Sequence, residues 1–434
     1  MVKMISLFSG VGGFDWGFKQ YGVEILFAND IRSEVVRAYA DNYGLKPVVC
    51  DDKGVIGFEK GKVLNCDINK VDFTDAGDVD IVIGGPPCQD FTMTRGPKRM
   101  GIMVERGRLY QQYVRVLKQV GPKIFVFENV PGLMTANDGL AFKTILKDFR
   151  ELNDKRDGYE ILFADVIDSS KHGVPQARKR LIILGVRRDL INKGELLLLR
   201  GIVNRLYGSG VFKEYPLTPM EVFTGRIIPE LQDEYVEIIR KWDGVWLKAN
   251  TKRAWEWKKM IWDRLSFNAV RDYLFFNQIG IGRYDGLEDI WRNHRSIMGL
   301  LGYHDWRVCS DPRDRCVDSM IRDERVRERM MMIPFGENKL FLMDEREGLI
   351  MSFNDRRIHM FKPSITILAS TRIYHYDRDR FLLRLAEEAR LQTFPRGFIF
   401  RGNASEVLRQ IGEAVPPLLS YRIAGVVDEL LRRL

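Results

Sequence analysis

The chain reads Val79-Asp80-Ile81-Val82-Ile83-Gly84-Gly85-Pro86-Pro87-Cys88-Gln89, an apolar run that leads into a proline-rich loop. A short, continuously apolar run is typical of a strand buried on both faces of a parallel sheet. The two prolines stiffen the loop that follows this strand. Cys88 is therefore held at the mouth of the predicted sheet, where it is positioned for chemistry.

The same pattern extends over the first part of the chain. From Lys3 to about Arg187, short apolar runs alternate with amphipathic segments, which predicts βαβ units and a parallel α/β sheet. Between about Arg188 and Met360 this alternation is lost, and seven of the eight tryptophans lie there. The other expected strands are Met4–Phe8, Ile25–Ala28, Ile124–Phe127 and Leu181–Val186.

A carboxyl group follows the second strand of this kind, because Ile124–Phe127 leads into Glu128-Asn129-Val130. A thiol and a carboxyl at two strand ends suit addition to a pyrimidine ring. Methylation of cytosine at C5 needs an activated ring, and a thiolate activates it by adding to C6. Glu128 would act at N3, with burial raising its pKa so that it holds a proton. A buried structural thiol is the alternative for Cys88.

Six blocks of the chain, in family order, resemble the DNA (cytosine-5)-methyltransferases of prokaryotic restriction-modification systems. Two of them are the Pro-Cys-Gln and Glu-Asn-Val segments, and the others are Ser6–Phe14, Gln176–Arg180 and the pair Glu388–Pro395 with Gly412–Pro416. The resemblance implies methyl transfer from S-adenosyl-L-methionine, with S-adenosyl-L-homocysteine as product. The acceptor would be C5 of a flipped-out cytosine in a specific duplex DNA sequence, attacked through a covalent Cys88–C6 bond.

The resemblance also implies how the chain divides into domains. A Rossmann-like methyltransferase domain would consist of residues 1–187 and 361–434, with a target recognition domain, 188–360, inserted between them. Lys362–Thr366 resembles the family's ninth motif, and a helix beginning near Pro416 should return beside the first strand and complete the cofactor pocket. Basic residues near Trp255–Trp262 are candidates for phosphate contacts.

A glycine turn after the first strand is the first candidate cofactor site. It is not a full GxGxxG, which fits a cofactor without a pyrophosphate. Asp30 ends the second strand, where an acidic side chain binds ribose hydroxyls, and the family's usual glutamate would reach further. Asp67 would bind the adenine amino group, or be an ordinary loop aspartate. The cofactor contacts that the resemblance implies are Phe8, Gly10, Val11, Gly12, Gly13, Asp30, Ile31, Asp67, Ile68, Pro87 and Val415.

Two arginines alternate along a strand that leads into Leu181. They are either solvent-facing charges or, as the resemblance implies, site residues. Arg180 would then reach cytosine O2 and orient Glu128, while Arg178 supports the catalytic loop or the cysteine. The predicted catalytic set is Cys88, Glu128, Arg180, Arg178 and Gln89.

The loop after Cys88 is rich in basic residues and glycines. It is either a solvated loop or a mobile flap that closes over the DNA backbone. The chain departs from the family pattern at three places. Asp90 stands where the family has a small residue, Val104-Glu105 where it has Asp-x, and Glu413 where it has asparagine. The basic residues are Arg95, Lys98, Arg99, Arg106 and Arg108.

Composition sets wider bounds. A length of 434 residues allows two or three domains, and a net charge of +9 permits a polyanionic partner. We find no signal peptide and no apolar run of transmembrane length. The cysteines other than Cys88 lack CxxC spacing, so we expect reduced core thiols, with a zinc site from Cys309, Cys316 and His304 as the alternative. The remaining cysteines are Cys50 and Cys66.

These observations predict a cytoplasmic, monomeric enzyme that acts on double-stranded DNA, with a cognate restriction endonuclease as a further partner and no bound metal. Two alternatives stay open. An RNA methyltransferase of the same fold would fit Phe91-Thr92, although its Cys-Phe-Thr motif reads Val222-Phe223-Thr224 here. A catalytically silent DNA-binding relative is disfavoured by the intact Cys88 and Glu128.

Overall fold

The computed structural model describes most of the two predicted catalytic segments and little of the region between them. The residues described are 1–50, 55–87, 108–152, 158–192, 194–208, 217, 219–222, 293, 296–303, 355–358, 363–369, 372–374, 383 and 385–434. Several predicted features lie outside them: Cys88, Gln89, the flap up to Arg106, the segment around Trp255–Trp262, and Cys309 with Cys316 and His304. Arg108 is the first residue of helix α4, Arg108–Val120.

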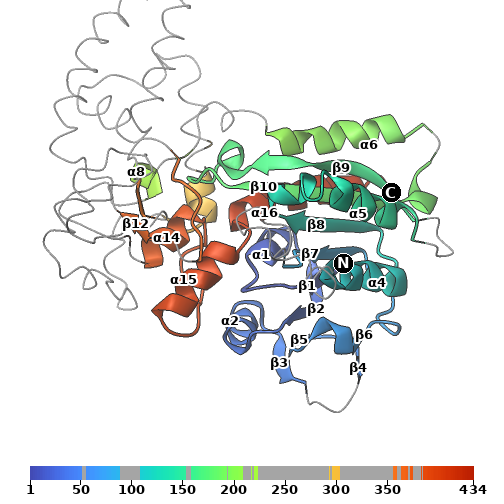
Figure 1. Ribbon diagram of the computed structural model, residues 1–434, viewed down its shortest axis with the longest axis horizontal. Coiled ribbons are helices and arrows are strands. Elements are labelled where there is room, and N and C mark those ends of the chain that lie inside the picture. Colours follow the sequence, from blue (N-terminus) through green and yellow to red (C-terminus); the bar gives the residue numbers. More distant parts are fainter. Residues whose placement is uncertain are drawn as a thin grey trace, which may run out of the picture.

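An eight-stranded sheet forms the centre of the described fold, in the order β3-β5-β2-β1-β7-β8-β10-β9 (Figure 1). All neighbouring strands run parallel except β10, which is antiparallel to β8 and β9. The strands are β1 Lys3–Leu7, β2 Glu24–Asp30, β3 Lys46–Val49, β5 Lys62–Asn65, β7 Ile81–Gly84, β8 Ile124–Asn129, β9 Tyr159–Asp168 and β10 Lys179–Arg187.

All five predicted strands are confirmed, as β1, β2, β7, β8 and β10. The expectation of a purely parallel sheet is wrong at β10. Its connection to β9 is only residues 169–178, and a parallel pair needs a crossover of a dozen residues or more. The sequence did not indicate β9 or the short strands β3 and β5.

Side chains of the central strands alternate between two hydrophobic cores. Ile81 and Ile83 face one core while Val82 faces the other, and the residues of β8 divide in the same way. The first core includes residues of α1 Gly13–Gln20, α6 Leu196–Val203 and α16 Pro417–Leu431, and the second those of α4 and α5 Leu140–Arg150. Burial on both faces explains why these strands are continuously apolar.

The remaining elements are short or lie at the edges of the sheet. Helix α2, Ser33–Tyr43, packs on β2 and β5, and α14 Leu385–Leu391 contacts α15 Ala404–Glu413. Small pairs of strands are β4 Ile56–Gly57 with β6 Val71–Asp72 and β11 Asp355–Arg357 with β12 Arg372–Tyr374. The other helical turns are α8 Pro219–Val222, η1 Ile68–Lys70, η3 Pro131–Met134, η4 Ser169–His172, η5 Arg188–Leu190 and η6 Asn204–Tyr207.

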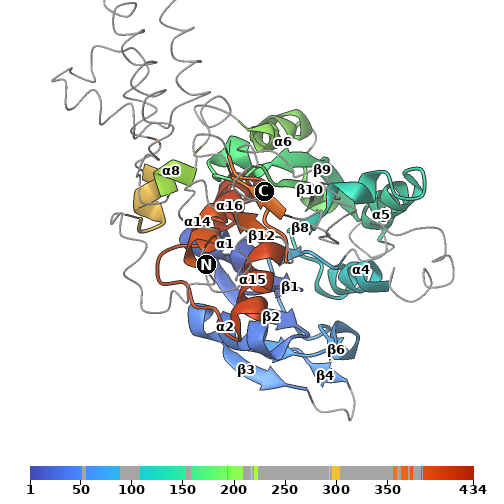
Figure 2. The same ribbon diagram turned by 60° about the vertical axis from the view of Figure 1, so that its left-hand side comes forward.

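The end of the chain returns to its beginning. Both ribbon views show the C-terminal helices beside the N-terminal part of the sheet (Figures 1 and 2). Helix α16 packs along α1, and the Ser420 hydroxyl donates a hydrogen bond to the carbonyl of Phe14. The predicted helix near Pro416 is thus confirmed, but it packs on α1 rather than beside the first strand, and none of its residues lines the cavity described below. The end of α15 and the segment Ala414-Val415, both before that helix, reach the cavity at the edge of the sheet.

The first part of the catalytic fold continues beyond residue 187. Leu199, Ile202 and Leu206 belong to the same core as β8 and α16. Tyr303 belongs to it too, and its hydroxyl donates to the carbonyl of Phe394. The boundary predicted at residue 187 therefore precedes elements that pack on the sheet.

A disulfide joins Cys50 to Cys66, with 5.4 Å between their Cα atoms. The expectation of reduced core thiols is wrong for this pair. The two cysteines follow the neighbouring parallel strands β3 and β5, which brings them together across fifteen intervening residues. Spacing along the sequence could not reveal this, because β3 was not recognised.

Within the described ranges, no helix is long and apolar enough to cross a membrane. The same ranges contain no cluster of three or more potential metal ligands.

Candidate active site

A cavity of about 910 Å³ opens at the carboxyl ends of β1, β2, β5, β7 and β8. Apart from Gly12, every predicted cofactor residue lines it, and so do Glu128, Arg178 and Arg180. Cys88 and Gln89 lie outside the described residues, but Pro87, which precedes them, is part of the wall. The structure therefore brings the described members of both predicted sets, apart from Gly12, into one cavity.

The turn after β1 forms the floor on the cofactor side. Gly10 and Gly12 have φ angles of 56° and 91°, a region that other residues rarely adopt. Gly12 packs against the ring of Tyr43, whose hydroxyl donates to the Gly12 carbonyl. Gly12 thus supports the turn through its contact with Tyr43, without lining the cavity itself. Phe8, at a φ of 52°, is a rare non-glycine residue in this region and lines the cavity.

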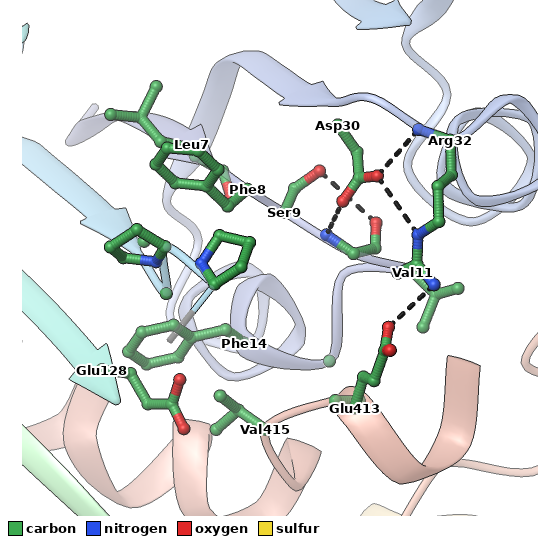
Figure 3. A pocket seen from close by; sticks show the side chains of 18 of the residues that line it. Leu7, Phe8, Ser9, Val11, Phe14, Asp30, Arg32, Glu128, Glu413 and Val415 are labelled. Atoms are coloured by element: carbon green, nitrogen blue, oxygen red, sulfur yellow. Dashed lines mark hydrogen bonds and ion pairs between the residues drawn. The ribbon is translucent and has the colours of Figure 1, made fainter. Parts of the chain in front are cut away.

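The carboxylate that ends β2 is held by two backbone amides. Asp30 Oδ2 accepts from the Gly10 amide at 3.1 Å, and Oδ1 accepts from the Arg32 amide at 3.0 Å. The Arg32 guanidinium lies 3.6 Å from the same carboxylate and forms an ion pair of 2.7 Å with Glu413 (Figure 3). Arg409 contacts Glu413 from the other side at 2.9 Å. The unusual charge of Glu413 is therefore balanced by two arginines.

Asp67 and Ile68 lie at the end of β5, on the same side of the cavity. Asp67 caps the turn η1, because its Oδ1 accepts from the backbone amide of Asn69 at 2.9 Å. Its neighbour Ile68 is buried. These two residues form the wall next to the Asp30 carboxylate.

Glu128 lies on the opposite side of the cavity from Asp30 (Figure 3). Its Oε1 is 3.0 Å from Arg180 Nε, as predicted for a carboxyl that Arg180 orients. Burial raises the pKa of Glu128, although the charges of Arg180 and Arg178 oppose the shift. A Cβ on Gly85 would come within 2.6 Å of Glu128 Oε2, so a larger residue there would displace the carboxyl from this position.

Arg178 is completely buried and ties three segments together. Its guanidinium donates to the carbonyls of Ile367 and Gly412 at 2.9 and 2.8 Å. Its burial contradicts the reading of a solvent-facing charge, and its observed contacts hold the returning C-terminal segments, a role that the sequence did not indicate. The nearby amide of Gln176 performs a similar task, since it donates to Gln392 Oε1 at 2.6 Å. The predicted support of Cys88 stays a prediction, because Cys88 lies outside the described residues.

Asn129 is a site residue to which the sequence assigned no role. Its side-chain amide donates to the Pro86 carbonyl at 3.1 Å, and its Oδ1 accepts from the Val130 amide. It thereby fixes the start of the loop that leads to Cys88. Its place inside the Glu-Asn-Val block was the available signal, as was Gln392 inside Glu388–Pro395.

Comparison with known proteins gives a consistent result. A family model described as C-5 cytosine-specific DNA methylase matches residues 2–429. DNA (cytosine-5-)-methyltransferase M.ApeKI of Aeropyrum pernix is 45% identical over 460 residues, with 98% of each chain covered. Type II methyltransferase M.NgoFVII of Neisseria gonorrhoeae is 28% identical over 426 residues, covering 96% of this chain and 83% of its own.

The fold also matches a crystal structure. A prophage-encoded E. coli protein, provisionally assigned as a DNA modification methyltransferase, aligns over the full length of both chains with a TM-score of 0.59. At 20% identity this likeness concerns the fold alone.

Proposed function

Because the chain belongs to the C-5 cytosine-specific DNA methylase family, we propose that its cavity holds S-adenosyl-L-methionine next to a cytosine attacked by Cys88. The protein is a DNA (cytosine-5-)-methyltransferase and uses S-adenosyl-L-methionine as methyl donor. The residue roles below rest on the geometry of the cavity. The observation that carries them is the Glu128–Arg180 pair, with side chains only 14% and 11% exposed, in the same cavity as the glycine turn.

The lining of the cavity fits this cofactor. Asp30 offers a carboxylate for the ribose hydroxyls, while Phe8, Ile68 and Val415 offer apolar contacts for the adenine side. A volume of about 910 Å³ also leaves room for a base beside the cofactor. When bound, S-adenosyl-L-methionine supplies an electrophilic methyl group.

The residues of the chain activate the cytosine. The Cys88 thiolate adds to C6 and makes C5 nucleophilic, and loss of the C5 proton with elimination later restores the thiol. Glu128 donates a hydrogen bond at N3, because its raised pKa keeps the carboxyl protonated to higher pH. Arg180 holds Glu128 and offers a donor to the O2 atom. Asn129 and Gly85 keep the loop and the carboxyl in place.

The target must leave the DNA duplex, because stacking hides C6 from the thiol. The region between the two catalytic segments would select the sequence, and the basic loop after Cys88 would close over the backbone. We further infer that the enzyme acts in the cytoplasm as a monomer. Its type II relatives support a partner endonuclease that cuts the same site.

The direct test is incubation with S-adenosyl-L-methionine and DNA of mixed sequence, followed by bisulfite sequencing. Protected cytosines should recur in one sequence context. The Cys88→Ala variant should lose methyl transfer and keep cofactor binding. Full methylation by this variant would contradict the covalent mechanism, and methylated transfer RNA beside unmodified DNA would favour the RNA alternative.

A further inference from the structure

The Cys50–Cys66 disulfide stands next to the proposed cofactor site. Cys66 lines the cavity and directly precedes Asp67 and Ile68. Cys50 follows β3, at the edge of the sheet, and is not part of the cavity lining. The bond therefore connects the cavity wall to a strand outside it.

The backbone of Cys66 is also tied to the acidic end of β2. Its amide donates to the Asp30 carbonyl at 3.1 Å, and its carbonyl accepts from Asn29 Nδ2 at 2.8 Å. A displacement of Cys66 would thus be passed to Asp30 on one side and to Asp67 on the other. Both are residues that the proposed function places against the cofactor.

Apart from the disulfide, strand β3 is held mainly by its pairing with β5 and by contacts with α2. Lys46, Pro47 and Val49 are exposed, and Val49 is 73% accessible. Among the described strands it pairs with β5 alone, and Val48 is its one side chain that packs against a core. The Lys46 and Cys50 amides add hydrogen bonds to the Gly61 and Asn65 carbonyls at 2.8 and 3.2 Å. An edge strand with so few buried side chains is a region of low local stability. Without the covalent bond, the end of β5 loses its fixed neighbour.

We propose that the Cys50–Cys66 disulfide is a positioning element of the cofactor site, so that the oxidised enzyme binds S-adenosyl-L-methionine more tightly than the reduced enzyme. The proposal rests on the proposed function, because it assumes that this cavity is where the cofactor binds. The disulfide touches no reacting atom and acts through Asp67, Ile68 and Asp30.

The chemistry of the two states is simple. A dithiol reductant gives two electrons and two protons, the S–S bond breaks, two thiols form, and the reductant closes to a cyclic disulfide. Cys50 is only partly buried, which gives a reductant access to one of the two sulfurs. Since binding and oxidation state are linked, the cofactor must also protect the disulfide by the same factor by which the disulfide improves binding.

The experiment uses the full chain carrying Cys88→Ala, so that the predicted nucleophile cannot take part in thiol exchange. Alkylation of the unreduced, unfolded protein should leave two of the remaining four cysteines unmodified. Calorimetric titration should then show a dissociation constant for S-adenosyl-L-methionine that rises roughly fivefold or more upon reduction, a common size for coupling between sites. Reoxidation should restore it.

Variants separate positioning from general loss of structure. Cys50→Ala breaks the bond without altering the cavity wall, and its affinity should match that of the reduced protein. Cys309→Ala/Cys316→Ala removes two other cysteines and should bind as the parent does. Circular dichroism checks that each variant is folded. Saturating S-adenosyl-L-methionine should shift the dithiol concentration needed for reduction by the factor found in the titrations, which a purely structural disulfide would not show.

Two results would overturn the proposal, and a third would refute the proposed function on which it rests. Alkylation of all four cysteines would mean that no disulfide forms. Equal affinity of the oxidised parent, the reduced parent and Cys50→Ala would mean that the bond does not position the site. Absence of cofactor binding in every form, combined with unmethylated DNA in the bisulfite assay of the native enzyme, would instead refute the proposed function.

Discussion

Glu128 is the residue whose environment bears most directly on the chemistry. Burial raises its pKa, so the proton-bearing form persists to higher pH than for a free glutamate. Methyl transfer should therefore fall as pH rises through that pKa. Glu128→Gln should slow single-turnover transfer by about 10²- to 10⁴-fold, the usual range for a positioned proton donor, and remove this pH limb. Binding of S-adenosyl-L-methionine serves as the control. An unchanged rate across the pH series would exclude Glu128 as the group at N3.

Gly85 tests the position of the same carboxyl without altering its charge. A methyl group there would approach Glu128 Oε2 to 2.6 Å, so Gly85→Ala must push the carboxyl away from its place beside Arg180. Misplacement by about 1 Å can cost about 100-fold in rate, and we expect a loss of that order in kcat. Gly201→Ala, where a Cβ meets nothing within 4 Å, is the matched control and should keep full activity. Comparable rates for the two variants would show that Glu128 tolerates displacement.

At this scale, the sequence predicted the residue types better than their contacts. The pairing of Glu128 with Arg180 was expected from the resemblance, and the structure has it. The partners of Glu413 were not foreseen, because Arg32 lies almost four hundred residues earlier and no local pattern joins the two. Cys88 remains a prediction, since it lies outside the described residues.

Among the elements, α1 and α2 meet through a buried carboxyl. Asp15, in α1, is completely buried, and its Oδ1 accepts from the Tyr39 hydroxyl of α2 at 2.7 Å. Burial raises the pKa of Asp15 from 3.8 to about 6. The folded state thus binds the proton more tightly than the unfolded state. The stability contributed by this group is fully present below pH 4 and is lost as pH rises through about 6.

Asp15→Asn should remove this dependence. From the shift, the native carboxyl costs about 3 kcal/mol at neutral pH relative to the protonated form. The difference in free energy of unfolding between Asp15→Asn and the native chain should therefore grow in favour of the variant between pH 4 and pH 7. Urea unfolding at a series of pH values measures it. A constant difference would mean that Asp15 titrates alike in both states.

The elements themselves could be predicted in proportion to their burial. Strands such as β7 and β8 are apolar on both faces and were found from sequence alone. Strand β3 was not predicted, because its side chains are mostly exposed. The disulfide at its end was therefore not predicted either. The antiparallel direction of β10 could not be predicted, because it depends on the short connection from β9. The sequence did not indicate that β9 is a strand.

At the scale of the whole molecule, the proposed cofactor cavity is lined by segments from both halves of the chain, Ser6–Phe14 near its start and residues 409–415 near its end. The order of the sequence blocks implied this return. The predicted boundary at residue 187 rested on the loss of strand-helix alternation, and it precedes α6, which packs in the same core as α16. Buried hydrogen bonds hold the returning segments against the residues that precede β10. Gln176 donates to Gln392, and Arg178 donates to the carbonyls of Ile367 and Gly412. At the cavity, the ion pair between Arg32 and Glu413 joins α15 to the segment that follows β2.

This ion pair should contribute to cofactor binding because it links α15 to Arg32, whose backbone amide donates a hydrogen bond to the Asp30 carboxylate. Side chains of Arg32 and Glu413 are 21% and 41% exposed, and such pairs contribute at most about 1 kcal/mol, or about fivefold in affinity. Glu413→Gln and Arg32→Met should each raise the dissociation constant of S-adenosyl-L-methionine by up to that factor. The double variant should lose less than the sum of the single variants, since both single variants remove the Arg32–Glu413 pair. Each single variant also removes a contact of its own, Arg32 with Asp30 or Glu413 with Arg409.

The matched control is the Arg401–Asp41 pair, with 2.6 Å between Arg401 Nε and Asp41 Oδ2. It also joins the C-terminal segment to α2, but neither residue lines the cofactor cavity. Arg401→Met should therefore leave calorimetric affinity unchanged. Added salt should weaken binding by the native chain more than by Glu413→Gln, because only the native chain has the pair to screen. Fully additive losses for Arg32 and Glu413 would show that the two side chains act independently and that the C-terminal segment closes the cavity without their help.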